Sequence, residues 1–494
     1  MPPPVRVRYA PSPTGAPHVG NIRAALFDWL FARHEGGAFI LRIEDTDRAR
    51  YVPSAVEAQL EALRWLGLGW DEGPDVGGPY APYVQSQRRE LYQDAARRLV
   101  ESGHAYECYC SAERLDALRN EQRERKQPPG YDGRCRTDEG RAKAKAEAAG
   151  APAVVRFKTP REGATTVQDY IRGEVTFRNS LIDDFIILKS DGFPTYHLAE
   201  AVDDHAMAIT HVIRGEEWLP SAPRHKLLFE ALGYGLPVFV HTPVILGPDR
   251  SKLSKRHGAQ SVLEYRDMGY LPDAVFNFLG LLGWSLDDKT EVISREEFVR
   301  HFSLARLIKS PAVFNIEKLN WMNGEYMRAM PVDRLAALLK DWLEKPAREG
   351  GLPDAVSRPI ELDYTARIVP SVRERVKLLS EAREMMAFFF LPNGLDLDAE
   401  TLLGKAFADD RERGRLLLSE ALVRAEHVER WSAQFLETEF RDLAERLGVK
   451  RGDLYMLMRV AVTGRPVAPP LFDSMELVGR ERCIRRLRDA LNLL

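Results

Sequence analysis

The chain has 494 residues, of which 45% are hydrophobic and 29% are charged, and its formal net charge is −3. This length exceeds what one hydrophobic core organises, so we expect several domains of ordinary globular composition rather than a disordered or membrane-spanning protein. The near-neutral charge excludes nucleic-acid binding through overall basicity, so any such partner must be held by local basic patches.

The first hundred residues alternate between strand and helix patterns. Residues 5–9 (VRVRY) alternate as a strand, and residues 22–35 space apolar side chains as a helix does. Residues 38–47 predict a second strand. A second helix follows, for which Ser54 and Glu57 predict a capping box and Gly67 the end. This alternation predicts an open α/β domain with a parallel sheet, which binds ligands beyond the carboxyl ends of its strands.

The pattern changes twice further along the chain. Between about residues 103 and 190, a cysteine pair, a charged helix-prone stretch and short strands predict an insertion. The α/β alternation resumes near residue 195 and ends after VFVHTPVIL, and helical periods then dominate to the end of the chain.

The turn between the first strand and the first helix reads APSPTGAPHVGN. Backbone N–H groups at a helix start are unpaired and favour phosphate. His18 could donate to a phosphate oxygen, and Gly20 would let a nucleotide approach the backbone. The alternative is a histidine that only caps or packs.

A basic loop, DRSKLSKRHG, follows the last strand pattern of the α/β region. Its Lys252 and Lys255 suit the charge that develops on a triphosphate, although an isolated run of this kind is usually a solvated surface. Together, PHVGN and KLSKR resemble the two signature motifs of the class I aminoacyl-tRNA synthetases, written HIGH and KMSKS in that family.

Further stretches are similar to the bacterial glutamyl-tRNA synthetases in particular. They are RYAPSPTGAPHVGN, FILRIEDTDRARYVP, LGLGWDEGPDVGGPYAPYVQSQR, GFPTYHLAEAVDDHAMAITHVIRGEEW, KLSKRHG and VFNIEKLNWMNGEY. The resemblance implies an ATP-dependent ligase that forms glutamyl-adenylate, releases pyrophosphate and transfers glutamate to the terminal adenosine of tRNA(Glu). In that family, activation normally waits for the tRNA. Mg²⁺ is expected on the triphosphate.

The resemblance also implies a fold: a class I Rossmann-type parallel sheet with an α+β insertion, followed by an all-α half that binds the anticodon. The expected regions are 1–102 and 195–246 (the two halves of the catalytic domain), 103–194 (an insertion for the tRNA acceptor end, with a zinc site), 247–330 (a stem-contact region carrying KLSKR), and 331–397 and 398–494 (two helical anticodon-binding domains).

Glutamate carries one ammonium and two carboxylates, so its pocket needs an anion and at least two cations or strong donors. Arg8 and Arg214, each at the end of a strand pattern, could clamp carboxylates, and Glu44 could hold the ammonium. Surface ion pairs are the alternative. The resemblance implies a pocket of Arg8, Ala10, Ser12, Glu44, Tyr196 and Arg214. Glu200 stands where the family pattern has Asn, and its carboxylate would repel the substrate unless it turns away or pairs with an arginine.

For ATP, the resemblance implies that His18 and Gly20 meet the phosphates and that Lys255, with Lys252 in the same motif, stabilises the departing pyrophosphate. Ile245 or Leu246 would present backbone groups to adenine. Glu217 matches a family position near the ATP and the tRNA end, or is an ordinary acid at a helix start. The substrate carboxylate is itself the nucleophile, so catalysis is positioning and electrostatic stabilisation.

Three of the four cysteines lie close in the sequence. They resemble the zinc site of some glutamyl-tRNA synthetases, with Asp132 or His104 as alternatives to a tyrosine ligand and free buried thiols as the alternative to zinc. The predicted ligands are Cys108, Cys110, Tyr131 and Cys135. Cys483 is most simply a core residue.

For the anticodon, the basic run SVRERVKLL is the candidate, because single-stranded bases need stacking partners and arginine hydrogen bonds. Arg375 aligns with the family position that rejects tRNA for glutamine, and a solvated helix face is the alternative. The expected partners are therefore tRNA(Glu), L-glutamate and ATP, for a monomer. We expect no membrane, and the absence of an apolar leader predicts a cytoplasmic protein.

Other functions remain to be separated from this one. A glutaminyl-tRNA synthetase shares the signature motifs, but its C-terminal half would be expected to contain β-barrels. A shorter paralogue that glutamylates a modified tRNA base lacks the C-terminal half altogether. A non-catalytic tRNA-binding regulator on a synthetase fold would have no use for complete ATP and amino-acid sites.

Overall fold

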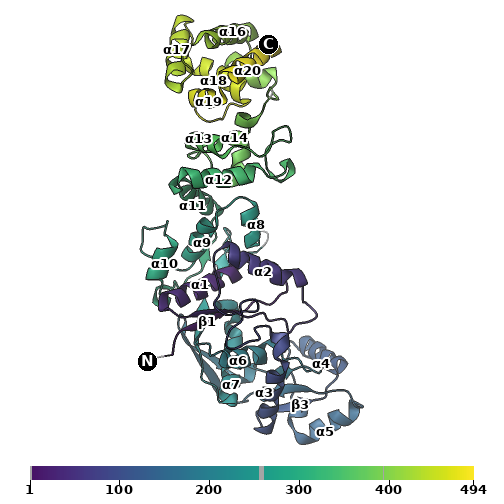
Figure 1. Cartoon of the computed structure of the whole chain (residues 1–494). Helices are drawn as coiled ribbons and strands as arrows, with labels where there is room; N and C mark the ends of the chain where they lie inside the picture. Colours follow the sequence, from purple (N-terminus) through teal and green to yellow (C-terminus); the bar gives the residue numbers. More distant parts are fainter. Residues whose placement is uncertain (1–2, 255–260, 393) are drawn as a thin grey trace. The chain divides into compact units, whose positions relative to one another are not determined.

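The computed structural model describes residues 3–254, 261–392 and 394–494. The chain forms two compact units, coloured along the sequence in Figure 1. The first unit comprises Met1–Arg266 and Val275–Asn315, and the second comprises Asp267–Ala274 and Ile316–Leu494. Among the described residues, no helix is both long and apolar enough to cross a membrane.

Parallel strands form the centre of the first unit. β1 (Arg6–Tyr9) pairs in parallel with β2 (Ala38–Leu41), and β8 (His211–Gly215) pairs in parallel with β9 (Val238–Thr242). The two pairs adjoin where the backbone N–H of Thr210 donates to the carbonyl of Arg6 at 2.9 Å. The predicted α/β fold with a parallel sheet is confirmed.

A hairpin from the middle of the chain joins this sheet. β5 (Ala164–Asp169) and β6 (Gly173–Arg178) are antiparallel, and β5 pairs in parallel with β9. The strand order is β6-β5-β9-β8. Residues 164–178 fall inside the stretch expected to be an insertion, yet their hairpin extends the sheet that carries β8.

A second, antiparallel sheet has the order β3-β4-β7. Its strands are β3 (Ala105–Cys108), β4 (Val154–Phe157) and β7 (Ile186–Leu188). Two helices, α4 (Ala112–Glu124) and α5 (Asp138–Glu147), lie in the chain between β3 and β4 (Figure 1). This part is the α+β region expected between the halves of the parallel sheet.

The second helix, α2 (Pro53–Trp65), begins differently from the prediction. Its N-cap is Val52, which makes no side-chain capping bond, and Pro53 takes the first helical position. The predicted capping box of Ser54 and Glu57 is therefore wrong, because a proline at the first position needs no partner for a backbone N–H and starts the helix early. Gly67 follows the helix with φ +69, as expected of its end.

Further helices and strands complete the chain up to residue 315. They are α1 (Val19–Glu35), η1 (Gln85–Arg88), α3 (Arg89–Glu101), η2 (Arg134–Arg136), η3 (Asn179–Leu181), α6 (Tyr196–Ala206), η4 (Glu216–Ser221), α7 (Ala222–Leu232), β10 (Ile245–Leu246), α8 (Val262–Asp267), α9 (Pro272–Leu281), α10 (Arg295–His301), η6 (Leu304–Arg306) and β11 (Ala312–Val313).

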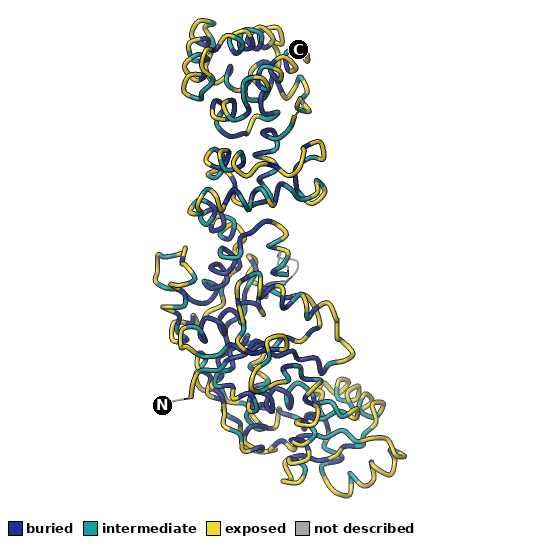
Figure 2. Tube along the Cα trace, viewed as in Figure 1, coloured by how far each residue is buried: buried dark blue, intermediate teal, exposed yellow. Residues whose placement is uncertain are grey.

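The regular elements described in the second unit are all helices. Its helices are α11 (Ile316–Ala329), α12 (Val332–Leu343), η7 (Ala347–Glu349), α13 (Leu362–Val372), η8 (Leu379–Glu381), α14 (Ala382–Phe390), α15 (Ala399–Phe407), α16 (Arg411–His427), α17 (Ala433–Arg446), α18 (Arg451–Thr463), α19 (Leu471–Val478) and α20 (Arg480–Leu493). They bury a hydrophobic core, drawn dark blue in Figure 2, which includes Cys483. The all-α expectation is confirmed, and a β-barrel is absent from the described part of this unit.

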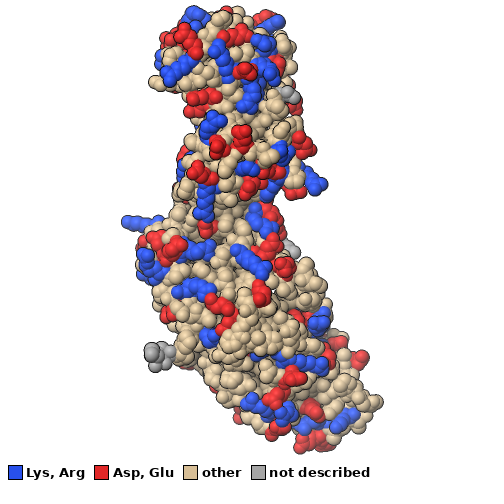
Figure 3. Space-filling view, in the orientation of Figure 1, with Lys and Arg blue, Asp and Glu red and all other residues tan. Residues whose placement is uncertain are grey.

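Charged side chains of both signs are mixed over the surface. Figure 3 shows lysine and arginine interspersed with aspartate and glutamate on the visible face of each unit. No single-sign face is visible in this view, in keeping with the net charge of −3.

Candidate active site

A cleft of about 560 Å³ lies in the first unit, where the chain leaves β1, β8 and β9. Most of the sequence-predicted site residues meet there. Those that line it are Arg8, Ala10, Ser12, His18, Gly20, Glu44, Tyr196, Arg214, Glu217, Ile245 and Lys252. Leu246 is not part of the lining, and Lys255 lies outside the described residues.

Arg8 and Arg214 converge on one carboxylate, that of Glu200. Arg8 Nη2 donates to Glu200 Oε1 at 3.1 Å, and Arg214 Nη1 donates to the same oxygen at 2.7 Å. All three side chains are buried. Glu200, the residue that departs from the family pattern, is thus paired with both arginines. A second carboxylate that enters the cleft would compete with Glu200 for these arginines.

An ion network surrounds this group. Arg8 Nε donates to Asp204 Oδ1 at 3.0 Å, and Arg42 Nη1 donates to the same oxygen at 2.7 Å. Arg42 Nη2 also donates to Glu44 Oε1 at 3.0 Å. Buried charges persist in proteins when they are paired and hydrogen-bonded, so each group here holds the orientation of its neighbours.

Glu44 is the acidic group expected to hold an ammonium. Burial, opposed by Arg42 and reinforced by Glu200, raises the pKa of Glu44 to about 7. Its carboxyl therefore changes charge near neutral pH. An ammonium ion placed beside it would stabilise the charged form.

Tyr196 begins helix α6 and faces Arg214. Its hydroxyl accepts a hydrogen bond from Arg214 Nη1 at 2.9 Å, which leaves the hydroxyl hydrogen to be donated elsewhere. The ring packs on Trp218, with the ring centroids 4.8 Å apart. Both aromatic residues line the cleft.

His18 is the N-cap of α1. Its Nδ1 accepts a hydrogen bond from the backbone N–H of Gly20 at 3.1 Å. In the neutral ring the proton is therefore on Nε2, which makes that nitrogen a donor. Among the described residues, a Cβ added to Gly20 would meet only His18 Nδ1, at 3.5 Å.

The expected adenine-binding backbone lies on β10. The carbonyl of Ile245 accepts from the N–H of Leu253 at 2.9 Å, and that of Leu246 accepts from the N–H of Phe314 at 2.8 Å. Both carbonyls thus have a partner within the chain. Lys252 forms an isolated bridge with Leu246 and is exposed at the cleft.

Sequence reasoning missed several residues of the cleft and its surroundings. Asp203 and Asp204 follow Tyr196 and Glu200 at helical spacing, so their common face could have been recognised. Asp203 accepts from Arg88 Nε at 2.7 Å. Asp28 lines the cleft with both carboxylate oxygens lacking hydrogen-bond partners in the described structure, and burial raises its pKa well above the usual range.

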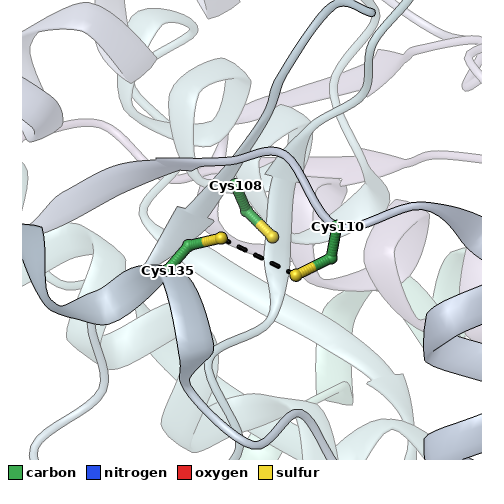
Figure 4. Close-up of side chains that lie close together, drawn as sticks. All are labelled: Cys108, Cys110 and Cys135. Carbon is green, nitrogen blue, oxygen red and sulfur yellow. Dashed lines mark hydrogen bonds between the residues drawn. The ribbon is translucent and has the colours of Figure 1, made fainter. Parts of the chain in front are cut away.

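The three cysteines of the first unit form a cluster. Figure 4 shows the side chains of Cys108, Cys110 and Cys135 pointing toward one another, and their sulfurs lie within 4.8 Å of one another. The Tyr131 hydroxyl lies 3.4 Å from Cys108 Sγ and 3.6 Å from Cys110 Sγ, and it accepts from the Cys135 N–H at 2.8 Å.

Neither of the two alternative ligands belongs to the cluster of sulfurs. His104 is exposed, and its Nδ1 lies 3.0 Å from Ser102 Oγ. Asp132 pairs with Arg114. Zn–S bonds of about 2.3 Å in a tetrahedron place sulfurs about 3.8 Å apart. The Cys110 and Cys135 sulfurs are 3.6 Å apart, a spacing compatible with two thiolate ligands of one zinc ion.

Arg375 lies in the second unit, just beyond the end of α13. It is exposed and lines a cavity of about 420 Å³ together with Arg367, Glu374 and residues of α19. The cavity contains cationic, acidic and apolar side chains. This composition offers hydrogen-bond donors beside a surface on which a base could stack.

Two family models match the chain. The model "tRNA synthetases class I (E and Q), catalytic domain" matches residues 4–321, and "Anticodon binding domain" matches residues 334–491.

Curated relatives and solved structures are similar over nearly the whole length. A glutamate–tRNA ligase of Dehalococcoides mccartyi is 54% identical over 99% of this chain and 98% of its own, and one of Desulforudis audaxviator is 46% identical over 99% and 96%. The crystal structure of a glutamate tRNA ligase from Elizabethkingia meningosepticum, in complex with its amino acid, aligns with a TM-score of 0.87 at 36% identity and covers 99% of both chains.

Proposed function

Since the chain belongs to the glutamate–tRNA ligases among the class I tRNA synthetases, we propose that the cleft at β1 and β8 joins glutamate to tRNA(Glu) in two steps. In the first, the α-carboxylate of glutamate attacks the α-phosphorus of ATP, and pyrophosphate leaves. In the second, a hydroxyl of the terminal adenosine of the tRNA attacks the activated carbonyl carbon, and AMP leaves.

The observation that carries this proposal is the convergence of two buried arginines, an acid and a tyrosine hydroxyl in one cleft. Arg8 and Arg214 bind the carboxylates of glutamate, Glu44 binds the ammonium, and Tyr196 donates to the side-chain carboxylate. Ala10 and Ser12 line the same pocket. A diacid with one ammonium matches the charges of the two arginines and of Glu44, and its carboxylates must share or displace the pairing that both arginines make with Glu200.

ATP enters as its Mg²⁺ complex, in which the ion neutralises part of the triphosphate charge. His18 Nε2 donates to a phosphate oxygen, and the backbone at Gly20 lies against the phosphates. Lys252 and Lys255 stabilise the departing pyrophosphate. Ile245 and Glu217, which line the cleft, complete the nucleotide site. The enzyme supplies no nucleophile, so its catalysis is positioning and stabilisation of developing charge.

The helical second unit binds the anticodon of the tRNA, and Arg375 contributes to the choice between tRNA(Glu) and tRNA(Gln). The α+β region around β3 binds the acceptor end. We further propose that the enzyme is a monomer and that it acts in the cytoplasm, where ATP and tRNA are both present.

Pyrophosphate exchange into ATP tests the proposal directly. We expect glutamate-dependent exchange in the presence of tRNA(Glu), and none with glutamine. Exchange without added tRNA would contradict tRNA-gated activation. Absence of exchange under every condition would favour a non-catalytic tRNA-binding protein, and charging of tRNA(Gln) in a parallel assay measures the discrimination assigned to Arg375.

We also propose that Cys108, Cys110, Cys135 and Tyr131 hold a structural Zn²⁺ ion. When bound, the ion would cross-link β3 to the loop that follows α4. Three clustered thiols, two of them buried, with a hydroxyl among them, form a donor set suited to zinc.

Replacing Cys135 with serine is expected to remove zinc and to lower the thermal midpoint of unfolding by several degrees, because a structural zinc site contributes directly to folding. Metal analysis of the purified chain and thermal unfolding measure both effects. The matched control is Cys483→Ser, a buried cysteine of the second unit, which should keep the metal. A wild-type chain that binds no zinc contradicts the proposal.

The pH dependence of glutamate use follows from Glu44. Its pKa of about 7 means that the carboxyl becomes neutral below that pH and no longer attracts the substrate ammonium. We expect kcat/KM for glutamate to fall by up to about tenfold per pH unit below pH 7. Burial lowers the pKa of His197 to about 4, so that ring does not titrate in this range. In a Glu44→Gln variant, kcat/KM for glutamate should no longer depend on pH in this range. If the variant keeps the pH dependence of the wild-type enzyme, the assignment to Glu44 is contradicted.

A further inference from the structure

Arg214 is held from behind by a chain of hydrogen bonds that the reaction described above does not use. Its Nε donates to His241 Nε2 at 3.0 Å, and His241 Nδ1 lies 2.7 Å from Asp169 Oδ2. The exposed fractions of Arg214, His241 and Asp169 are 6%, 0% and 4%. Solvent therefore competes little for these bonds, and they orient the guanidinium more firmly than surface contacts would.

The sheet brings the three side chains into one row. Arg214 on β8 and His241 on β9 are register partners in a parallel pair, so their side chains stand on the same face. Asp169 ends β5, the other neighbour of β9, where it pairs with Phe239. Three adjacent strands thus each contribute one member of the chain.

The hydrogen bonds define the proton positions. A guanidinium only donates, so His241 Nε2 must be an unprotonated acceptor and the ring proton must lie on Nδ1. Burial opposes charge on Asp169, but hydrogen bonds from His241 and backbone amides hold its pKa below the ordinary value. Burial lowers the pKa of His241. The pair is therefore a carboxylate beside a neutral imidazole.

We propose that Asp169 and His241 are positioning residues for the amino-acid substrate: by fixing the imidazole tautomer, they hold the guanidinium of Arg214 in the orientation that receives glutamate. The inference rests on the proposed function, in which Arg214 binds a substrate carboxylate. With the opposite tautomer, the Nε2–H of His241 would face the Nε–H of Arg214, and the two donors would push apart. A carboxylate is bound bidentately only when the plane of the guanidinium is fixed.

The first test is Asp169→Asn. An asparagine amide can donate to Nδ1, which moves the ring proton to Nε2 and removes the acceptor from Arg214. With saturating tRNA(Glu), we expect KM for glutamate to rise about 10- to 100-fold, the range of a lost charge-assisted hydrogen bond, while KM for ATP stays unchanged. Glu174→Gln is the matched control, because it removes an exposed carboxylate from the same hairpin.

Asp169 also supports its own turn, since its Oδ1 accepts from the N–H groups of Ile171 and Arg172 at 3.0 and 2.7 Å. A second background separates the two roles. In His241→Gln, the side-chain amide oxygen can accept from Arg214 and has no ring tautomer that Asp169 must fix. Adding Asp169→Asn to His241→Gln should therefore raise KM for glutamate by less than about threefold. His241→Leu keeps Asp169 and the turn, and should raise KM as Asp169→Asn does.

The outcomes are distinct. Asp169→Asn can raise KM for glutamate equally in the wild-type chain and in His241→Gln. That result overturns the inference, because the Asp169 carboxylate then acts only by supporting the turn of its hairpin. An unchanged KM for glutamate in Asp169→Asn and in His241→Leu overturns the inference as well. The proposed function still stands in that case if the wild-type enzyme shows glutamate-dependent pyrophosphate exchange. Wild-type enzyme without glutamate-dependent exchange overturns both.

Discussion

Replacing Arg214 with alanine is expected to lower kcat/KM for glutamate about 100- to 1,000-fold, the effect of removing one partner from a buried, hydrogen-bonded charge pair. Arg214 donates to Tyr196, Glu200, His225 and His241, so its loss removes a substrate contact and loosens four neighbours. Steady-state pyrophosphate exchange at varied glutamate, with tRNA(Glu) present, measures the change.

Arg214→Lys refines this prediction. Lysine keeps the charge but lacks the planar fork, so it cannot satisfy His241 and a substrate carboxylate together, and an intermediate loss is expected. Arg97→Ala is the control, because Arg97 is an exposed arginine whose ion pairs among the described residues, with Asp94 and Glu101, lie within its own helix. A variant of Arg214 with unchanged KM for glutamate and a raised KM for ATP would place Arg214 in the nucleotide site instead.

Replacing His18 is expected to lower kcat about 100- to 1,000-fold, the usual effect of losing one donor aimed at developing charge. The geometry allows capping and catalysis to be separated. Nδ1 caps the helix, and Nε2 carries the proton that we assign to the phosphate. His18→Ala loses both roles, and the lost cap should also cost about 1 kcal/mol of stability.

His18→Asn is the decisive variant. The asparagine side-chain oxygen can replace Nδ1 as the acceptor for the Gly20 N–H, so helix stability should be retained while the donor at Nε2 is lost. We expect kcat to fall as far as in His18→Ala, measured by exchange at saturating glutamate and ATP. Full activity in His18→Asn would show that His18 only caps the helix.

The candidate site was predictable wherever its residues are close in the sequence. PHVGN marked a strand-to-helix turn, and His18 is indeed the N-cap of α1. The cysteine spacing marked a cluster, and the three sulfurs meet. The start of α2 shows the limit of such patterns, since Pro53 displaced the capping box that Ser54 and Glu57 suggested.

The sequence by itself determined the alternation of strands and helices, the helical second half and the family, because these depend on local periodicity and on motifs a few residues long. Only the tertiary structure decided the partners of the arginines. Arg8 meets Glu200 across 192 positions, and Asp169 meets His241 across 72. Strand order and register set those pairs. A hairpin that the sequence pattern assigned to an insertion supplies Asp169, because β5 pairs with β9 and so places its carboxylate behind Arg214.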